Sequence, residues 1–154
     1  MQPPPQQPIA TTTKKLFSRT TTVNAAIQAP PAVIWSLLTD VERYPTWNST
    51  IISIEGSIQP GGSIKLKSKL DPKRTFTLKV RDFQENTRLV WGDAMGNRIY
   101  TLEDNGASGT RFTMTETIGG PLFPLFASQI PSFDTCFEQL TLDLKQAAEA
   151  GNTR

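Results

Sequence analysis

The chain has 154 residues and a net charge of +2, with one cysteine and no histidine. An internal disulfide is therefore impossible, a zinc site built on His and Cys ligands is nearly excluded, and the Ser-His and Cys-His forms of nucleophilic catalysis are excluded. The length predicts a single domain. The positive charges are scattered, which argues against nucleic-acid binding. No run approaches the roughly 20 apolar residues of a membrane span, and the N-terminus lacks a signal-peptide pattern, so we expect a cytoplasmic protein without a membrane span.

The first 13 residues are rich in proline and polar side chains and contain almost nothing to bury. This composition predicts a flexible tail over residues 1–13 and one domain over residues 14–150. Because the tail cannot offset roughly 1–2 kcal/mol of backbone ordering per residue, we expect residues before about Lys14 to add little stability. A proline-rich docking segment is the alternative interpretation.

The domain is expected to open with a strand over Ser18–Gln28, followed by two short helices. Asp40 is placed to cap the second helix, Val41–Tyr44, which Pro45 is expected to end. The first helix is predicted by an apolar stripe at helical spacing, formed by Val33, Ile34, Leu37 and Leu38.

Six consecutive strands are expected next, then an irregular segment over Leu122–Ile130 and a long final helix. Alternating side chains and turn residues predict the strands at Ile51–Glu55, Ser63–Leu70, Phe76–Val80, Arg88–Asp93, Arg98–Asp104 and Thr110–Ile118. The final helix is predicted from Ser132, its N-cap, to about Ala150, because apolar residues recur there at three- and four-residue steps.

The last hairpin places an Arg–Glu pair beside apolar pairs. A turn centred on Ala107 makes Arg98 face Glu116, Tyr100 face Met114 and Leu102 face Phe112, all on one side of the sheet. Because most of these side chains are large and apolar, that side is expected to be concave. Arg98 would then anchor a ligand carboxylate or phenolate, with Glu116 orienting it. A structural salt bridge, or an outward-facing pair after a one-residue register error, is the alternative.

The order of these elements resembles the START-like, helix-grip (SRPBCC) superfamily, and within it the polyketide cyclase/dehydrase branch. The resemblance extends from about Arg19 to Ala150, and it implies an α+β fold. A curved seven-stranded antiparallel sheet would wrap around a long C-terminal helix, with two short helices after the first strand. The residues that carry the resemblance are Ile27–Asn48, Gly56, Gly61-Gly62, Leu89-Val90-Trp91, Thr101–Phe112 and the closing LKQAAEA.

Three functions are compatible with this superfamily. The first, which we favour, is non-catalytic binding of a small hydrophobic molecule, such as a lipid, an isoprenoid or an aromatic, polyketide-like metabolite. The second is a cyclase, dehydrase or hydrolase, in which Arg98 stabilises enolate charge and Glu116 or Tyr100 moves protons. The third is a co-chaperone-like interaction module, which requires an exposed apolar patch.

No cofactor and no metal are expected, and Cys136 is interpreted as an inert thiol. The partner expected is the small hydrophobic ligand, with a homodimer as a further option. The side chains expected to contact the ligand are Trp47, Phe76, Leu78, Trp91, Arg98, Tyr100, Leu102, Phe112, Met114, Glu116, Phe126, Phe133 and Phe137. For the aromatic residues among them, ordinary packing between helices and sheet is the alternative.

Overall fold

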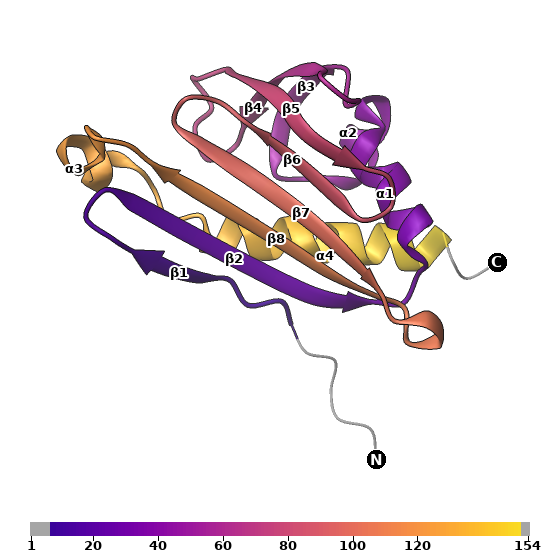
Figure 1. The fold of residues 1–154 in the computed structure, drawn as a ribbon. Coiled ribbons are helices and arrows are strands. Elements are labelled where there is room, and N and C mark those ends of the chain that lie inside the picture. The colour runs from indigo at the N-terminus through magenta and orange to yellow at the C-terminus, as the bar shows by residue number, and fades with distance from the viewer. Residues whose placement is uncertain (1–6, 152–154) are drawn as a thin grey trace.

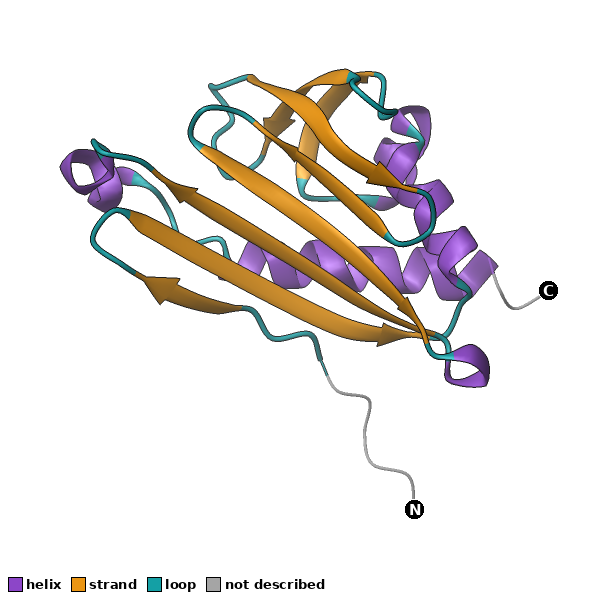
Figure 2. Ribbon diagram, in the orientation of Figure 1, coloured by secondary structure: helices purple, strands orange, loops and turns teal. Residues whose placement is uncertain are grey.

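The computed structural model describes residues 7–151 and contains one sheet of eight antiparallel strands (Figure 1, Figure 2). The order across the sheet is β1-β2-β8-β7-β6-β5-β4-β3. The strands are β1 (Thr11–Lys14), β2 (Ser18–Ile27), β3 (Ile51–Gly56), β4 (Ser63–Ser68), β5 (Phe76–Gln84), β6 (Arg88–Gly92), β7 (Gly96–Asp104) and β8 (Thr110–Gly119). The helical segments are α1 (Pro31–Thr39), η1 (Val41–Arg43), α2 (Tyr44–Trp47), η2 (Gly106–Ser108), α3 (Phe123–Phe126), η3 (Ala127–Gln129) and α4 (Asp134–Gly151).

The long helix α4 lies across one face of the sheet and closes the core (Figure 1). Its apolar residues recur at three- and four-residue steps, so they share one face of the helix. Phe137, Leu140, Leu144 and Ala148 on that face are each at most 3% exposed. This arrangement confirms the predicted helix-grip architecture. No helix in residues 7–151 has the length and apolar character needed to cross a membrane.

The inward-facing side chains of the strands form the other half of the core. In the β7–β8 hairpin, Tyr100 pairs with Met114 and Leu102 pairs with Phe112, as the register analysis predicted. All four side chains are buried. Because successive strand residues point to opposite faces, the same alternation also brings Arg98 and Glu116 to the inner face.

The sheet has one strand more than expected, because β1 forms within the predicted tail. Residues Thr11–Lys14 pair with β2 at the sheet edge, and Ala10 is buried. The Ala10 N–H donates to the Glu138 carboxylate at 2.9 Å, and the Thr12 hydroxyl donates to Asp134 at 2.5 Å. The predicted boundary at residue 13 therefore falls inside a paired strand, and the strand count of seven is corrected to eight. Residues 1–6 of the predicted tail lie outside the described residues.

Threonine explains why this strand escaped sequence analysis. The segment carries no apolar alternation, yet its hydroxyls suit cross-strand pairing. The Thr12 and Thr21 hydroxyls lie 2.9 Å apart, and β2 makes the same kind of pair with β8 through Thr20–Thr117 and Thr22–Thr115. The strand is stabilised by hydrogen bonds, which hydrophobic periodicity does not detect.

The helical segment after β2 differs from the prediction at Pro45. Asp40 caps η1 as expected, because its carboxylate accepts the Glu42 N–H at 3.2 Å. Pro45, however, sits in the first turn of α2 and does not end a helix. A proline is tolerated at this position because the N–H that it lacks has no partner within a first helical turn.

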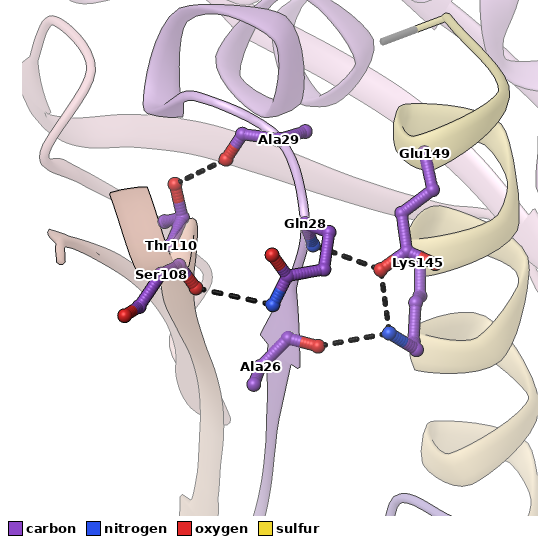
Figure 3. Close-up of polar contacts among 7 residues, drawn as sticks. All are labelled: Ala26, Gln28, Ala29, Ser108, Thr110, Lys145 and Glu149. Atoms are coloured by element: carbon purple, nitrogen blue, oxygen red, sulfur yellow. Dashed lines mark hydrogen bonds and ion pairs between the residues drawn. The ribbon is translucent and has the colours of Figure 1, made fainter. Parts of the chain in front are cut away.

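Polar contacts fix the C-terminal half of α4 to one end of the sheet (Figure 3). The Lys145 ammonium donates to the Ala26 carbonyl at 3.0 Å, and the Glu149 carboxylate accepts the Gln28 N–H at 2.8 Å. The Thr110 hydroxyl donates to the Ala29 carbonyl at 2.7 Å, which joins the start of β8 to the loop between β2 and α1. These contacts leave the opposite end of the sheet to be covered by other segments.

Strand β1 yields the first testable prediction. Deleting residues 1–14 should lower the free energy of unfolding by roughly 1–3 kcal/mol, because it removes the strand pairing and the hydrogen bonds to Glu138 and Asp134. For a chain of this size the melting temperature should fall by about 2–4 °C for each kcal/mol. Deleting only residues 1–6 keeps every one of these contacts and serves as the control. Equal melting temperatures for the two truncated proteins would show that β1 adds nothing.

Candidate functional site

A cavity of about 420 Å³ lies at the end of the sheet that is opposite the Lys145 contacts. Its walls come from strands β4 to β8 and from the segment that leads into α4. The apolar lining residues are Leu66, Leu70, Phe76, Leu78, Trp91, Met95, Ile118, Phe126, Ile130, Pro131 and Phe133. The other lining residues are Ser68, Asp71, Arg74, Gly92, Asp93, Gly96, Asn97, Arg98, Glu116 and Gln129.

An ion pair between Arg98 and Glu116 lies on the wall of this cavity. The two residues are register partners, and Arg98 Nε donates to Glu116 Oε1 at 2.8 Å. Arg98 Nη1 donates to the Tyr100 hydroxyl at 3.3 Å, and the guanidinium carbon lies 4.9 Å from the centre of the Phe137 ring. The side chains are 16% and 18% exposed. The predicted pairing on the inner face is therefore present.

The protonation states of Arg98 and Tyr100 follow from burial and from nearby charges. Burial by itself would lower the pKa of Arg98, but Glu116 and Tyr100 outweigh burial and raise this pKa. Burial also raises the pKa of Tyr100, although the nearby Arg98 opposes that shift. Arg98 therefore stays charged and Tyr100 stays protonated at neutral pH. A protonated phenol can donate a hydrogen bond, but it is poorly suited to act as a general base.

Arg19 holds in place the segment that closes the cavity. This β2 residue is only 7% exposed and points to the inner face. Its guanidinium donates to the carbonyls of Ile130 at 3.2 Å and Pro131 at 2.7 Å, and it lies 4.7 Å from the centre of the Phe133 ring. All three of those residues line the cavity. Sequence reasoning missed Arg19, although an arginine at an inward position of a predicted strand was the available signal.

The rim of the cavity includes the tight β6–β7 turn. The Asp93 carboxylate accepts the N–H groups of Met95 at 2.8 Å and Gly96 at 3.2 Å. A Cβ atom at Gly92 would lie 2.3 Å from the Gly96 carbonyl oxygen, so this close approach requires glycine. The turn brings Trp91 and Arg98, on either side of it, to the same wall as register partners.

Seven of the thirteen side chains expected to contact a ligand line the cavity, and six do not. The lining set is Phe76, Leu78, Trp91, Arg98, Glu116, Phe126 and Phe133. The remaining six are packed in the buried core: Trp47, Tyr100, Leu102, Phe112, Met114 and Phe137. Tyr100 and Phe137 nevertheless contact Arg98 and so form the support behind the cavity wall.

Two further features bear on the chemistry available here. Burial raises the pKa of the Cys136 thiol, which disfavours the reactive thiolate. Within residues 7–151, no three His, Cys, Asp or Glu side chains are grouped so that they could hold a metal ion.

A comparison with known proteins identifies the family of this chain. Residues 18–149 match the family described as polyketide cyclase / dehydrase and lipid transport. The chain belongs to this family. The match confirms the resemblance to the START-like superfamily, of which this polyketide cyclase family is part. No curated protein matches the chain.

Solved structures support the same fold. A conserved protein of unknown function, EF2215 from Enterococcus faecalis, is 18% identical with a TM-score of 0.68, covering 94% of this chain and 80% of its own. Protein NE0264 from Nitrosomonas europaea is 15% identical with a TM-score of 0.66, covering 92% of this chain and 100% of its own. A START superfamily protein from Mycobacterium smegmatis is 18% identical with a TM-score of 0.59, covering 87% and 98%. At these identities the similarity to solved structures establishes the fold alone.

The Arg98–Glu116 pair yields a stability prediction. Glu116→Gln should lower the free energy of unfolding by roughly 1–3 kcal/mol, because it leaves a largely buried guanidinium without its counter-charge. The double variant Arg98→Met/Glu116→Leu should be close to wild type, because it removes both charges. Urea unfolding of each protein measures these values.

The exposed pair Arg88–Asp82 provides a matched control for this experiment. Its Nε–Oδ2 distance is 2.9 Å, and its side chains are 40% and 36% exposed. Asp82→Asn should therefore cost about 1 kcal/mol or less. An equal cost for Glu116→Gln and Asp82→Asn would contradict a buried role for the inner pair.

Proposed function

We propose that this protein binds a small, mostly apolar molecule in the cavity between the sheet and the segment that leads into α4, and that it does so without catalysis. The observation that carries the proposal is a cavity of about 420 Å³ with apolar walls and one partly buried ion pair. Ligand sites of proteins combine apolar walls with a few fixed polar groups, and this volume lies within their usual range. The lipid transport half of the family description agrees with such a function.

A cyclase or dehydrase is less well supported by the polar groups of the cavity. Such an enzyme needs an acid and a base within reach of the reacting atoms. The Arg98 guanidinium is already bound to Glu116, Tyr100 is protonated and buried behind the wall, and the Asp93 carboxylate accepts two backbone N–H groups. Because each of these three groups is engaged in a structural contact, none is placed as a free acid or base, and the site supports ligand binding better than catalysis.

Filling the cavity tests the proposal. Ile118→Phe should reduce the affinity for an uncharged, fluorescent apolar probe such as N-phenyl-1-naphthylamine at least about tenfold, because the larger side chain occupies ligand space. Ile52→Phe is the matched control, because Ile52 lies exposed on β3, outside the cavity lining. Titration of probe fluorescence measures both affinities. Equal affinity for the two variants would place the probe elsewhere and contradict the proposal.

A homodimeric interaction module is the second candidate, and a group of exposed apolar side chains favours it. Leu16 and Phe17 lie in the β1–β2 turn, whereas Leu122 and Leu125 lie at α3, and all four are exposed. The Gly120 N–H donates to the Phe17 carbonyl at 3.0 Å, which joins the two segments at one end of the molecule (Figure 1). Exposed apolar groups of this kind are typical of interaction sites.

Sedimentation equilibrium separates this second candidate from a purely ligand-binding role. If the apolar group is a homodimer interface, the wild type should be dimeric and Leu122→Ser/Leu125→Ser should weaken the dimer at least about tenfold. Ile9→Ser, which also changes an exposed apolar side chain, is the control and should leave the dimer intact. A monomeric wild type would remove the homodimer from consideration.

A further inference from the structure

We propose that the polar end of the ligand is an uncharged group that both donates and accepts hydrogen bonds, such as a hydroxyl or a carboxamide. This inference rests on the proposed binding function and names the chemical class that the cavity selects. It differs from the sequence-based interpretation, in which Arg98 anchors a carboxylate or a phenolate. The difference arises from how the Arg98–Glu116 pair is arranged inside the cavity.

The pair presents one donor side and one acceptor side. Arg98 uses Nε for Glu116 Oε1 and Nη1 for Tyr100, and Phe137 covers a face of its guanidinium. Among the described residues, neither Arg98 Nη2 nor Glu116 Oε2 has a hydrogen-bond partner, and neither is a fully buried unsatisfied atom. A guanidinium nitrogen can only donate and a carboxylate oxygen can only accept. A ligand group that fits both atoms must therefore accept from one and donate to the other.

The charges around the cavity do not favour an anion. Its lining contains two cations, Arg74 and Arg98, against the three carboxylates Asp71, Asp93 and Glu116. Glu116 lies 2.8 Å from Arg98, so the guanidinium is already neutralised. A ligand carboxylate would compete with Glu116 for Arg98 and would place two negative charges side by side in a partly dehydrated site.

Arg19 does not alter this balance. It is the other arginine on the inner face, but both of its terminal nitrogens donate to the carbonyls of Ile130 and Pro131. The Asp134 and Glu116 charges also act on it. The hydrogen bonds of Arg19 therefore hold the segment that closes the cavity. Arg98 and Glu116 remain as the pair that can make polar contacts with a ligand.

Three compounds that share one ring system test the inference by isothermal titration calorimetry at neutral pH. The probes are 2-naphthamide, which donates and accepts, 2-naphthoate, which is anionic and only accepts, and 2-methylnaphthalene, which does neither. The wild type should bind 2-naphthamide at least about tenfold more tightly than 2-naphthoate, since hydrogen bonds to charged groups are worth about that much. It should also bind 2-naphthamide more tightly than 2-methylnaphthalene.

Two variants assign this preference to the ion pair. Glu116→Gln removes the negative charge, so 2-naphthoate should gain at least about tenfold in affinity and approach or overtake 2-naphthamide. Arg98→Met/Glu116→Leu should bind 2-methylnaphthalene at least as tightly as the wild type and lose the preference for the amide. The double variant keeps the test valid if Glu116→Gln fails to fold. Arg88→Met/Asp82→Leu, which removes the exposed outer pair, should keep the wild-type ranking.

The outcomes separate this inference from the proposed function. Tightest binding of 2-naphthoate to the wild type would overturn the inference and leave the proposed function standing. An unchanged ranking in Arg98→Met/Glu116→Leu would also overturn it, because the preference would then arise elsewhere. If none of the three compounds binds to the wild type or to the double variant, both the inference and the proposed binding of such apolar molecules fail.

Discussion

The packing of α4 against the inner face of the sheet is the interaction on which the rest of this structure depends. One face of the helix buries Phe137, Leu140, Leu144 and Ala148 almost completely. At roughly 1.5–3 kcal/mol for each large apolar side chain, this contact is a major stabilising term. The polar contacts of Lys145 and Glu149 with the end of β2 then fix the position of the helix along the sheet (Figure 3).

The cavity exists because this packing covers only part of the sheet. Helix α4 begins at Asp134, and the preceding residues are short helical turns and extended chain. The irregular segment spans the open end of the sheet and leaves space beneath it. Arg19 holds this segment by donating to two of its carbonyls and by packing on the Phe133 ring. The segment is therefore attached to the sheet by a buried cation, whereas α4 is attached mainly by apolar side chains.

A buried charge next to an apolar cavity requires a partner, and Glu116 is the partner of Arg98 here. In the proposed function, this pair sets which polar groups of a ligand the cavity accepts. Glu116 accepts a hydrogen bond from Arg98 Nε, and among the described residues Arg98 Nη2 and Glu116 Oε2 are left without a hydrogen-bond partner. Burial of an ion pair contributes little net stability compared with apolar residues of the same volume. This comparison supports the proposed role of the pair in ligand recognition.

The sequence by itself determined the elements with strong periodicity and the registers that follow from them. The alternation of β7 and β8 around their turn was enough to pair Arg98 with Glu116, because the side-chain period of a strand leaves only two choices of face. The apolar spacing of α4 likewise identified its buried face. Both patterns are local, so they can be recognised from neighbouring residues alone.

Only the tertiary structure decided which residues reach the cavity and which support it. Tyr100 and Arg98 share one face of β7, yet Arg98 lines the cavity and Tyr100 lies behind it in the core, where its ring packs against Trp91 and Phe112. Strand β1 depends on hydroxyl pairs and on contacts with Asp134 and Glu138, which are more than 120 positions away in the chain. Arg19 acquires its role from the carbonyls of Ile130 and Pro131, which are 111 and 112 positions away in the chain. Such contacts depend on how separate elements meet in space, and no local pattern of residues encodes them.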